Sequence, residues 1–177
     1  MSHLNEKVVE LVRLALSLEL GGEHFYRHAA GMTEHPKGRE MFIKLAEQER
    51  ARRADIGALF SAIIGEHEWQ RIAAEEAAHV HPADVVAQLE AAFAARGHAA
   101  VADDAQALRL ALELKRRAIH FYTEVEKHTA DAETLGALRK LIDEERFHYD
   151  FLQGQLDSVQ NVGVWLDGPE FRMDGRF

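Results

Sequence analysis

One group of residues occurs twice in this chain at a constant distance, and this repeat restricts the possible folds more than any other feature. The tripeptide His-Phe-Tyr stands at residues 24–26 and again at 120–122, an offset of 120 − 24 = 96 residues. The pair Glu-Arg at 49–50 returns at 145–146 with the same offset, 145 − 49 = 96. Because both matches share one register, the repeated unit is longer than either match. The sequence therefore predicts an architecture built from two copies of one unit.

The repeated unit is predicted to be helical. Good helix formers are abundant throughout the chain, and apolar residues recur three or four positions apart, as at Val8, Leu11, Val12, Ala15 and Leu18. This spacing is typical of amphipathic helices. We expect four long helices and a shorter fifth one, at about 4–31, 36–64, 104–128, 132–160 and, between Pro82 and Gly97, 82–96.

Connection lengths predict how these helices are arranged. The first two helices and the last two are joined by short links, so each pair should form an antiparallel hairpin. The crossover between the hairpins, at about 66–103, is long and contains the fifth helix. This arrangement predicts an all-α four-helix bundle with one long crossover, formed as a single domain by residues 1–160. The aromatic tail at 161–177 is expected to pack on the bundle or on a partner subunit, because exposed apolar clusters are rare.

Composition excludes several classes of function. The chain has no cysteine, so disulfides, cysteinyl zinc sites, iron–sulfur clusters and thiol catalysis are excluded. A formal net charge of −9, with Lys and Arg scattered among Asp and Glu, argues against nucleic-acid binding. The chain contains no run of eighteen apolar residues, so no membrane span is expected. Its first residues also lack the layout of a signal peptide. We therefore expect a cytoplasmic protein.

Acidic residues and a histidine stand at corresponding places in the two hairpins. Glu145 and His148 are spaced i, i+3, so both side chains can reach one metal ion from the same helix face. A solvated surface pair would have the same spacing, so this pair is informative mainly through its place in the repeat. In the first helix, Glu19 stands in an apolar run, shares its face with Glu23 and precedes Tyr26 by two turns.

These motifs resemble the rubrerythrin-type family of ferritin-like proteins over about residues 4–160. In that family, one helix of each hairpin carries a Glu several residues before a Phe-Tyr, and the other carries Glu-x-x-His. The matching positions are Glu19, Glu49, Glu145 and His148. Other positions depart from the pattern: Arg52 stands where a His is expected, Lys115 where a Glu is expected, and Ala118 where a further carboxylate is expected. The cysteine-ligated iron module of full rubrerythrins is absent.

The resemblance implies a site for two metal ions, each bound by one terminal Glu, one His and two shared Glu residues. Here one ion would keep Glu19 but meet Arg52 in place of its His. The other would keep His148 but meet Lys115 in place of its Glu. Both replacements stay protonated near neutral pH. We therefore expect them to neutralise the carboxylates of Glu19, Glu49 and Glu145, and to limit metal binding to one weakly held ion.

Two functions are compatible with such a site. The first is a metal-dependent oxidoreductase, of the peroxide-reducing or ferroxidase type, with one iron, manganese or zinc ion on Glu19, Glu23, Glu145 and His148. The second is a metal-free, non-catalytic structural or interaction bundle, stabilised by buried salt bridges. Tyr26 and Tyr122 should point inward and suit either a bond to a carboxylate or a radical or proton role. We further expect a homodimer formed through bundle faces or the tail, and the sequence indicates no particular redox partner.

Overall fold

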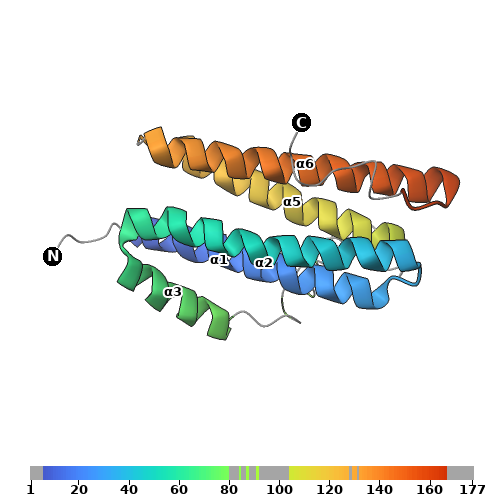
Figure 1. Ribbon diagram of the computed structural model, residues 1–177, viewed down its shortest axis with the longest axis horizontal. Coiled ribbons are helices and arrows are strands. Elements are labelled where there is room, and N and C mark those ends of the chain that lie inside the picture. Colours follow the sequence, from blue (N-terminus) through green and yellow to red (C-terminus); the bar gives the residue numbers. More distant parts are fainter. Residues whose placement is uncertain are drawn as a thin grey trace.

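The protein is an all-helical bundle in the computed structural model (Figure 1), which describes residues 6–79, 84, 87, 91, 104–127, 129–130 and 132–166. The described part contains five helices and no strand. The helices are α1 (Glu6–Met32), α2 (Pro36–Ile64), α3 (Glu66–His79), α5 (Asp104–Lys127) and α6 (Ala132–Val162). The all-α bundle predicted from the sequence is confirmed, and the four long helices agree with their predicted bounds to within two residues.

Local sequence explains where α2 begins and ends. His35 precedes α2 in an extended conformation, and its Nδ1 accepts a hydrogen bond from the Lys37 N–H at 3.3 Å. Pro36 occupies the first helical position, where a missing N–H costs nothing. At the other end, Gly65 adopts φ +90°, which favours glycine, and α3 starts at the next residue.

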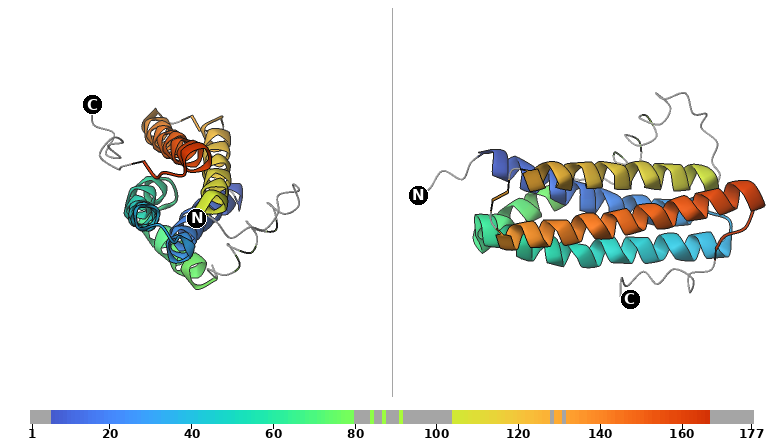
Figure 2. Two further views of the ribbon diagram at one scale, coloured as in Figure 1. Left: turned by 90° about the vertical axis from the view of Figure 1, so that its right-hand side faces the viewer. Right: turned by 90° about the horizontal axis from the view of Figure 1, so that it is seen from above.

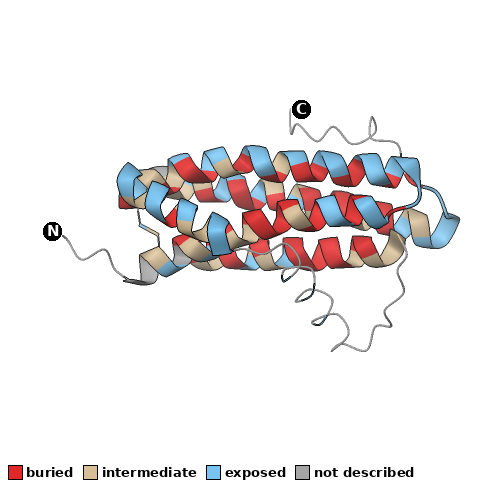
Figure 3. Ribbon diagram, turned by 90° about the horizontal axis from the view of Figure 1, so that it is seen from below, coloured by how far each residue is buried: buried red, intermediate tan, exposed pale blue. Residues whose placement is uncertain are grey.

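Two antiparallel hairpins lie side by side, α1 with α2 and α5 with α6 (Figure 1). In the end-on view of Figure 2, the four long helices surround a common interior, and α3 lies outside it against α1 and α2. The buried residues face this interior along all four helices (Figure 3). One copy of the repeated unit therefore forms the α1–α2 hairpin, and the other copy forms the α5–α6 hairpin that faces it.

The interior consists of two apolar clusters with a charged layer between them. One cluster, which includes Phe25, Phe42 and Leu152, lies toward the end of the bundle where α2 begins. The other, which includes Val12 and Leu138, lies toward the end where α2 finishes. On each long helix, buried charged residues lie in sequence between the two clusters: Glu19 on α1, Glu49 and Arg52 on α2, Lys115 on α5, and Glu145 and His148 on α6. The core therefore encloses a polar layer near its middle.

The crossover differs from expectation in the part that the structure describes. Helix α3 was not predicted: it follows α2 directly, and its Trp69 ring stacks on Phe60 at 6.2 Å between centroids. Arg13 of α1 also binds α3, at 2.5 Å from Glu75 and 2.8 Å from Glu76. The helix predicted at 82–96 lies outside the described residues, apart from three isolated positions. Among the described helices, none combines the length and hydropathy needed to cross a bilayer.

The chain turns back at the end of α6. Gly163 has φ +70°, and Trp165 is buried, 3 % exposed, in the cluster with Phe42. The Trp165 indole N–H donates to Asp104 at 3.0 Å, at the start of α5. Trp165 thus ties the end of α6 to α2 and α5, whereas residues 167–177 of the predicted tail lie outside the described part of the chain.

Candidate functional site

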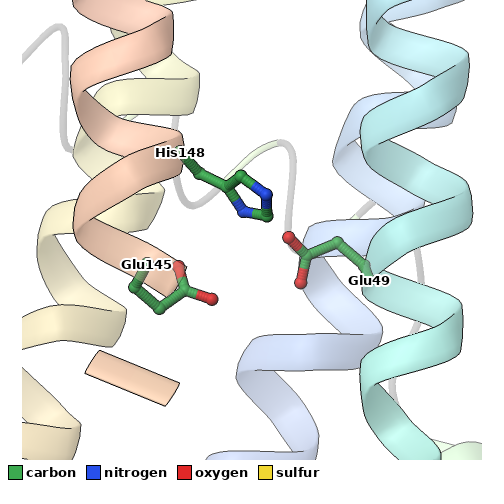
Figure 4. Close-up of side chains that lie close together, drawn as sticks. All are labelled: Glu49, Glu145 and His148. Atoms are coloured by element: carbon green, nitrogen blue, oxygen red, sulfur yellow. The ribbon is translucent and has the colours of Figure 1, made fainter. Parts of the chain in front are cut away.

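The charged layer is formed by residues that correspond through the 96-residue repeat. Each hairpin contributes one residue to each of four pairs: Glu19 and Lys115, Glu49 and Glu145, Arg52 and His148, and Tyr26 and Tyr122. All eight side chains are buried. In Figure 4, Glu145 and His148 project from α6 toward Glu49 on α2. The structure therefore brings together the positions that the repeat predicted to be equivalent.

Lys115 binds both central carboxylates. Its ammonium Nζ forms an ion pair with Glu49 Oε1 and lies 2.9 Å from Glu145 Oε2. The side chain is 2 % exposed, and Nζ also lies 5.7 Å from the centroid of the Tyr26 ring. Although burial alone would lower the pKa of Lys115, the two carboxylates hold it above its usual value. Lys115 is therefore a fixed positive charge between the hairpins.

Arg52 is the second buried cation. Its Nη1 donates to Glu145 Oε1 and lies 3.6 Å from Glu49 Oε2. Its Nη2 lies 3.0 Å from Nδ1 of His148. Because a guanidinium can only donate, Nδ1 of His148 accepts this bond, and any proton on the neutral ring is on Nε2. Burial and the nearby charges of Lys115 and Arg52 lower the pKa of His148 to about 3, so the imidazole is neutral at pH 7.

Two of the cluster's three carboxyl groups have pKa values shifted in opposite directions. Burial tends to raise the pKa of Glu49, but Lys115 and Arg52 outweigh it and lower the pKa to about 2. Burial, together with repulsion by Glu49 and Glu145, raises the pKa of Glu19 well above its usual value. Tyr122 Oη donates to Glu19 Oε1 at 2.8 Å, whereas Glu19 Oε2 has no hydrogen-bond partner among the described residues. Burial and repulsion by the neighbouring carboxylates therefore favour the protonated form of Glu19 more than that of Glu49.

The two cations are matched by the two carboxylates that they contact. Arg52 and Lys115 pair with Glu49 and Glu145 at the centre of the layer. A buried charge is tolerated only when it is paired and hydrogen-bonded, and here each carboxylate contacts both cations. The layer is therefore balanced by the side chains themselves.

The cluster offers few unoccupied ligand atoms for a metal ion. Among the described residues, Glu49, Glu145 and His148 offer ligand atoms that all lie within 4.8 Å of one another. Arg52, however, contacts both Glu145 and His148, and Lys115 contacts both carboxylates. Three donor atoms with two cations among them do not fit a pair of divalent ions. They could hold one ion only if Arg52 moved away.

Glu23 is buried but is not part of this cluster. It forms ion pairs with Arg27 at 3.0 Å and with Arg53 of α2 at 2.5 Å. Glu23 was predicted to lie on the ligand face, and its partner Arg53, one turn after Glu49, was not predicted. Glu144 was not predicted either, and its Oε2 lies 3.7 Å from Nε of Arg52.

The two tyrosines differ in a way that follows from Lys115. Tyr122 Oη donates to Glu19, whereas the equivalent partner of Tyr26 is a lysine, which offers no acceptor. Tyr26 Oη has no hydrogen-bond partner among the described residues, although the side chain is completely buried. Of the two predicted bonds to a carboxylate, the structure shows only that of Tyr122.

Comparison with known proteins gives the family. No curated protein and no solved structure matched the chain. The sequence model of the rubrerythrin family matches residues 10–156, which include most of both hairpins and every residue of the charged layer. With the repeated hairpin and the buried Glu and His positions already described, this match shows that the chain belongs to the rubrerythrin family.

Proposed function

We propose that this chain is a metal-independent member of the rubrerythrin family, acting as a structural or interaction bundle and not as a metal oxidoreductase. The observation that carries the proposal is the placement of Arg52 and Lys115 in ion pairs with both central carboxylates. In this view the two side chains supply the positive charge that two metal ions supply in the family pattern.

The energetics of ion entry support the proposal. A divalent cation that approached Glu49 and Glu145 would be repelled by two fixed positive charges. Binding would also separate at least one cation from its carboxylates, and breaking a buried ion pair costs about 3–5 kcal/mol. The free energy of metal coordination would be reduced by this amount, which corresponds to a loss of roughly two to four orders of magnitude in affinity.

A second candidate is a single-ion site, and one observation favours it. The ligand atoms of Glu49, Glu145 and His148 already lie within 4.8 Å of one another. If Arg52 turned outward to Glu144 and Lys115 released one oxygen of each carboxylate, two carboxylates and one neutral imidazole could bind iron, manganese or zinc, all of which accept such donors. An oxidoreductase function belongs to this candidate. Glu23 would not take part, because Arg27 and Arg53 hold it.

Elemental analysis distinguishes the two candidates. Protein purified without chelators, then incubated with ferrous, manganous or zinc ions and desalted, should contain far less than one ion per chain. A His148→Ala variant is the matched control, because any residual ions that it retains are bound elsewhere. A full ion per chain that disappears in His148→Ala would replace the first candidate by the second. Two ions per chain would contradict both.

A further inference from the structure

One glycine lies against the charged layer from within a helix. Gly22 is buried and stands well inside α1 (Glu6–Met32). In a helix interior, glycine destabilises the folded state relative to alanine, because it loses more conformational freedom on folding. The equivalent residue of the second hairpin, at 22 + 96 = 118, is Ala118, which is the better helix former. The repeated unit itself therefore does not require a glycine here, and the reason for Gly22 lies in its own surroundings.

The side chain of Glu49 fills the space beside Gly22. A Cβ on Gly22 would lie 3.3 Å from Oε2, 3.4 Å from Cδ and 3.5 Å from Cγ of Glu49, and these are the three nearest atoms. A distance of 3.3 Å is tighter than an ordinary contact of a Cβ, so the carboxylate would have to move by a few tenths of an ångström. The missing side chain of Gly22 thus allows Glu49 to approach the backbone of α1.

Such a movement of Glu49 would disturb its ion pairs. Oε1 pairs with Nζ of Lys115, and Oε2 lies 3.6 Å from Nη1 of Arg52. Oε2 is also the atom that would meet a Cβ on Gly22 most closely. The Glu49 side chain is 3 % exposed, so water could not replace an ion pair that was weakened. The position of this carboxylate is therefore fixed from several sides.

The contact between Glu49 and Arg52 would be affected first. Arg52 donates directly to Glu145, and Lys115 contacts both Glu49 and Glu145. At 3.6 Å, the distance from Arg52 to Glu49 is the longest of the four ion-pair contacts in the layer. It is close to the limit of about 4 Å for an ion pair. Glu49 therefore depends on its exact position to contact both cations.

We infer that Gly22 is a positioning residue of the charged layer: the side chain that it lacks leaves the space in which the Glu49 carboxylate meets both Lys115 and Arg52. The inference rests on the proposed function, because it concerns the ion pairs that carry that proposal. The two can still fail separately. Metal uptake by the wild type would contradict the proposed function, whereas the role of Gly22 is tested by unfolding experiments that contain no metal.

Gly22→Ala tests whether the space is needed. Thermal unfolding followed by circular dichroism, in buffer with a chelator, should show a Tm lower by roughly 2–12 °C, because the added methyl group displaces a buried, paired carboxylate. The matched control is Gly31→Ala on the same helix, where a Cβ would meet nothing within 4 Å. There Tm should stay the same or rise. Equal Tm values for the two variants would overturn the inference.

Two further backgrounds separate a positioning role from simple overpacking. Glu49→Asp shortens the side chain by one methylene group, so Gly22→Ala should no longer lower Tm in that background. Lys115→Met removes one ion pair of Glu49 and leaves its carboxylate freer to move, so Gly22→Ala should cost less than half as many degrees there as in the wild type.

The Lys115→Met comparison decides the question even if Glu49→Asp does not fold. An undiminished loss of Tm in the Lys115→Met background would overturn the inference, because the methyl group would then disturb packing and not the ion pairs. A loss that persists in a folded Glu49→Asp background would overturn it as well, because the methyl group would then clash with something other than the Glu49 carboxylate.

Discussion

Replacing Lys115 by Met removes one buried cation and keeps a side chain of similar length. Glu49 and Glu145 would then share Arg52 alone, leaving one buried negative charge without compensation. Loss of one partner from a buried ion pair typically costs about 3–5 kcal/mol. At roughly 2–4 °C per kcal/mol for a chain of this size, Tm should fall by roughly 6–20 °C.

The loss of stability caused by Lys115→Met should be larger at neutral pH than at acidic pH. In the wild type, Glu49 has a pKa of about 2, below its unfolded value, so it stabilises the folded state above the unfolded pKa. That contribution is lost as pH falls through the folded pKa. Because Lys115→Met removes the main favourable influence on Glu49, the wild type and the variant should differ most at neutral pH. The difference should narrow below about pH 4.5.

Thermal and urea unfolding followed by circular dichroism, at pH 7.5 and pH 4, would measure this effect. The matched control is Lys127→Met on the same helix, where the lysine is exposed and pairs with Glu124. Such a surface substitution should change stability by less than about 0.5 kcal/mol. If Lys115→Met were as harmless as Lys127→Met, or if its deficit were the same at both pH values, the assignment of Lys115 as a buried counter-ion would be wrong.

Three further outcomes follow from the same contacts. Tyr122→Phe should destabilise the protein by about 1–3 kcal/mol because Glu19 loses its donor, whereas Tyr26→Phe should be neutral or stabilising because its hydroxyl has no partner; urea unfolding of both variants compares them. Gly38→Ala should lower the free energy of unfolding by about 1–3 kcal/mol and alter tryptophan fluorescence, because the added Cβ would clash with Trp165. Gly136→Ala, which has open space around it, should stabilise α6 by up to about 1 kcal/mol. His148 should show no titration between pH 5 and 8 in NMR spectra of the folded protein, because its pKa is about 3. In the unfolded chain the same imidazole takes up a proton near pH 6.5, so the free energy of unfolding should decrease as pH falls from 6.5 toward 3.

Much of the bundle could be predicted because its determinants are local or repeated. Helix spacing, Pro36 and the 96-residue offset are visible along the chain, and the offset alone places Arg52 opposite His148. The raised pKa of Glu19 could not be predicted, because it depends on burial and on the three-dimensional closeness of Glu49 and Glu145. The partner of Glu23 was missed for a similar reason: Arg53 comes from a neighbouring helix, whose rotation the sequence leaves open.

Helix α3 shows a different limit. Trp69, Ile72 and Ala73 have helical spacing and contact the second apolar cluster, but Gly65 separates them from α2 by a single residue. A glycine followed by an acidic segment is typical of a loop as well as of a new helix. Only the packing of Trp69 on Phe60 and the pairing of Arg13 with α3 select the helix.

If Arg52 and Lys115 take the place of two metal ions, thermal unfolding with and without metal should separate the wild type from a variant that restores the ligands. The double variant Arg52→His with Lys115→Glu adds a carboxylate and removes both fixed cations, so without metal it should unfold well below the wild type. Ferrous or manganous ions should then stabilise it, by about 2.7 kcal/mol at a concentration one hundred times Kd, because a ligand that binds only the folded state shifts the equilibrium toward it. The wild type should gain almost nothing from the same ions. If the wild type gains as much from metal as the double variant does, the two cations are not substitutes for metal, and the charged layer is an ordinary metal centre.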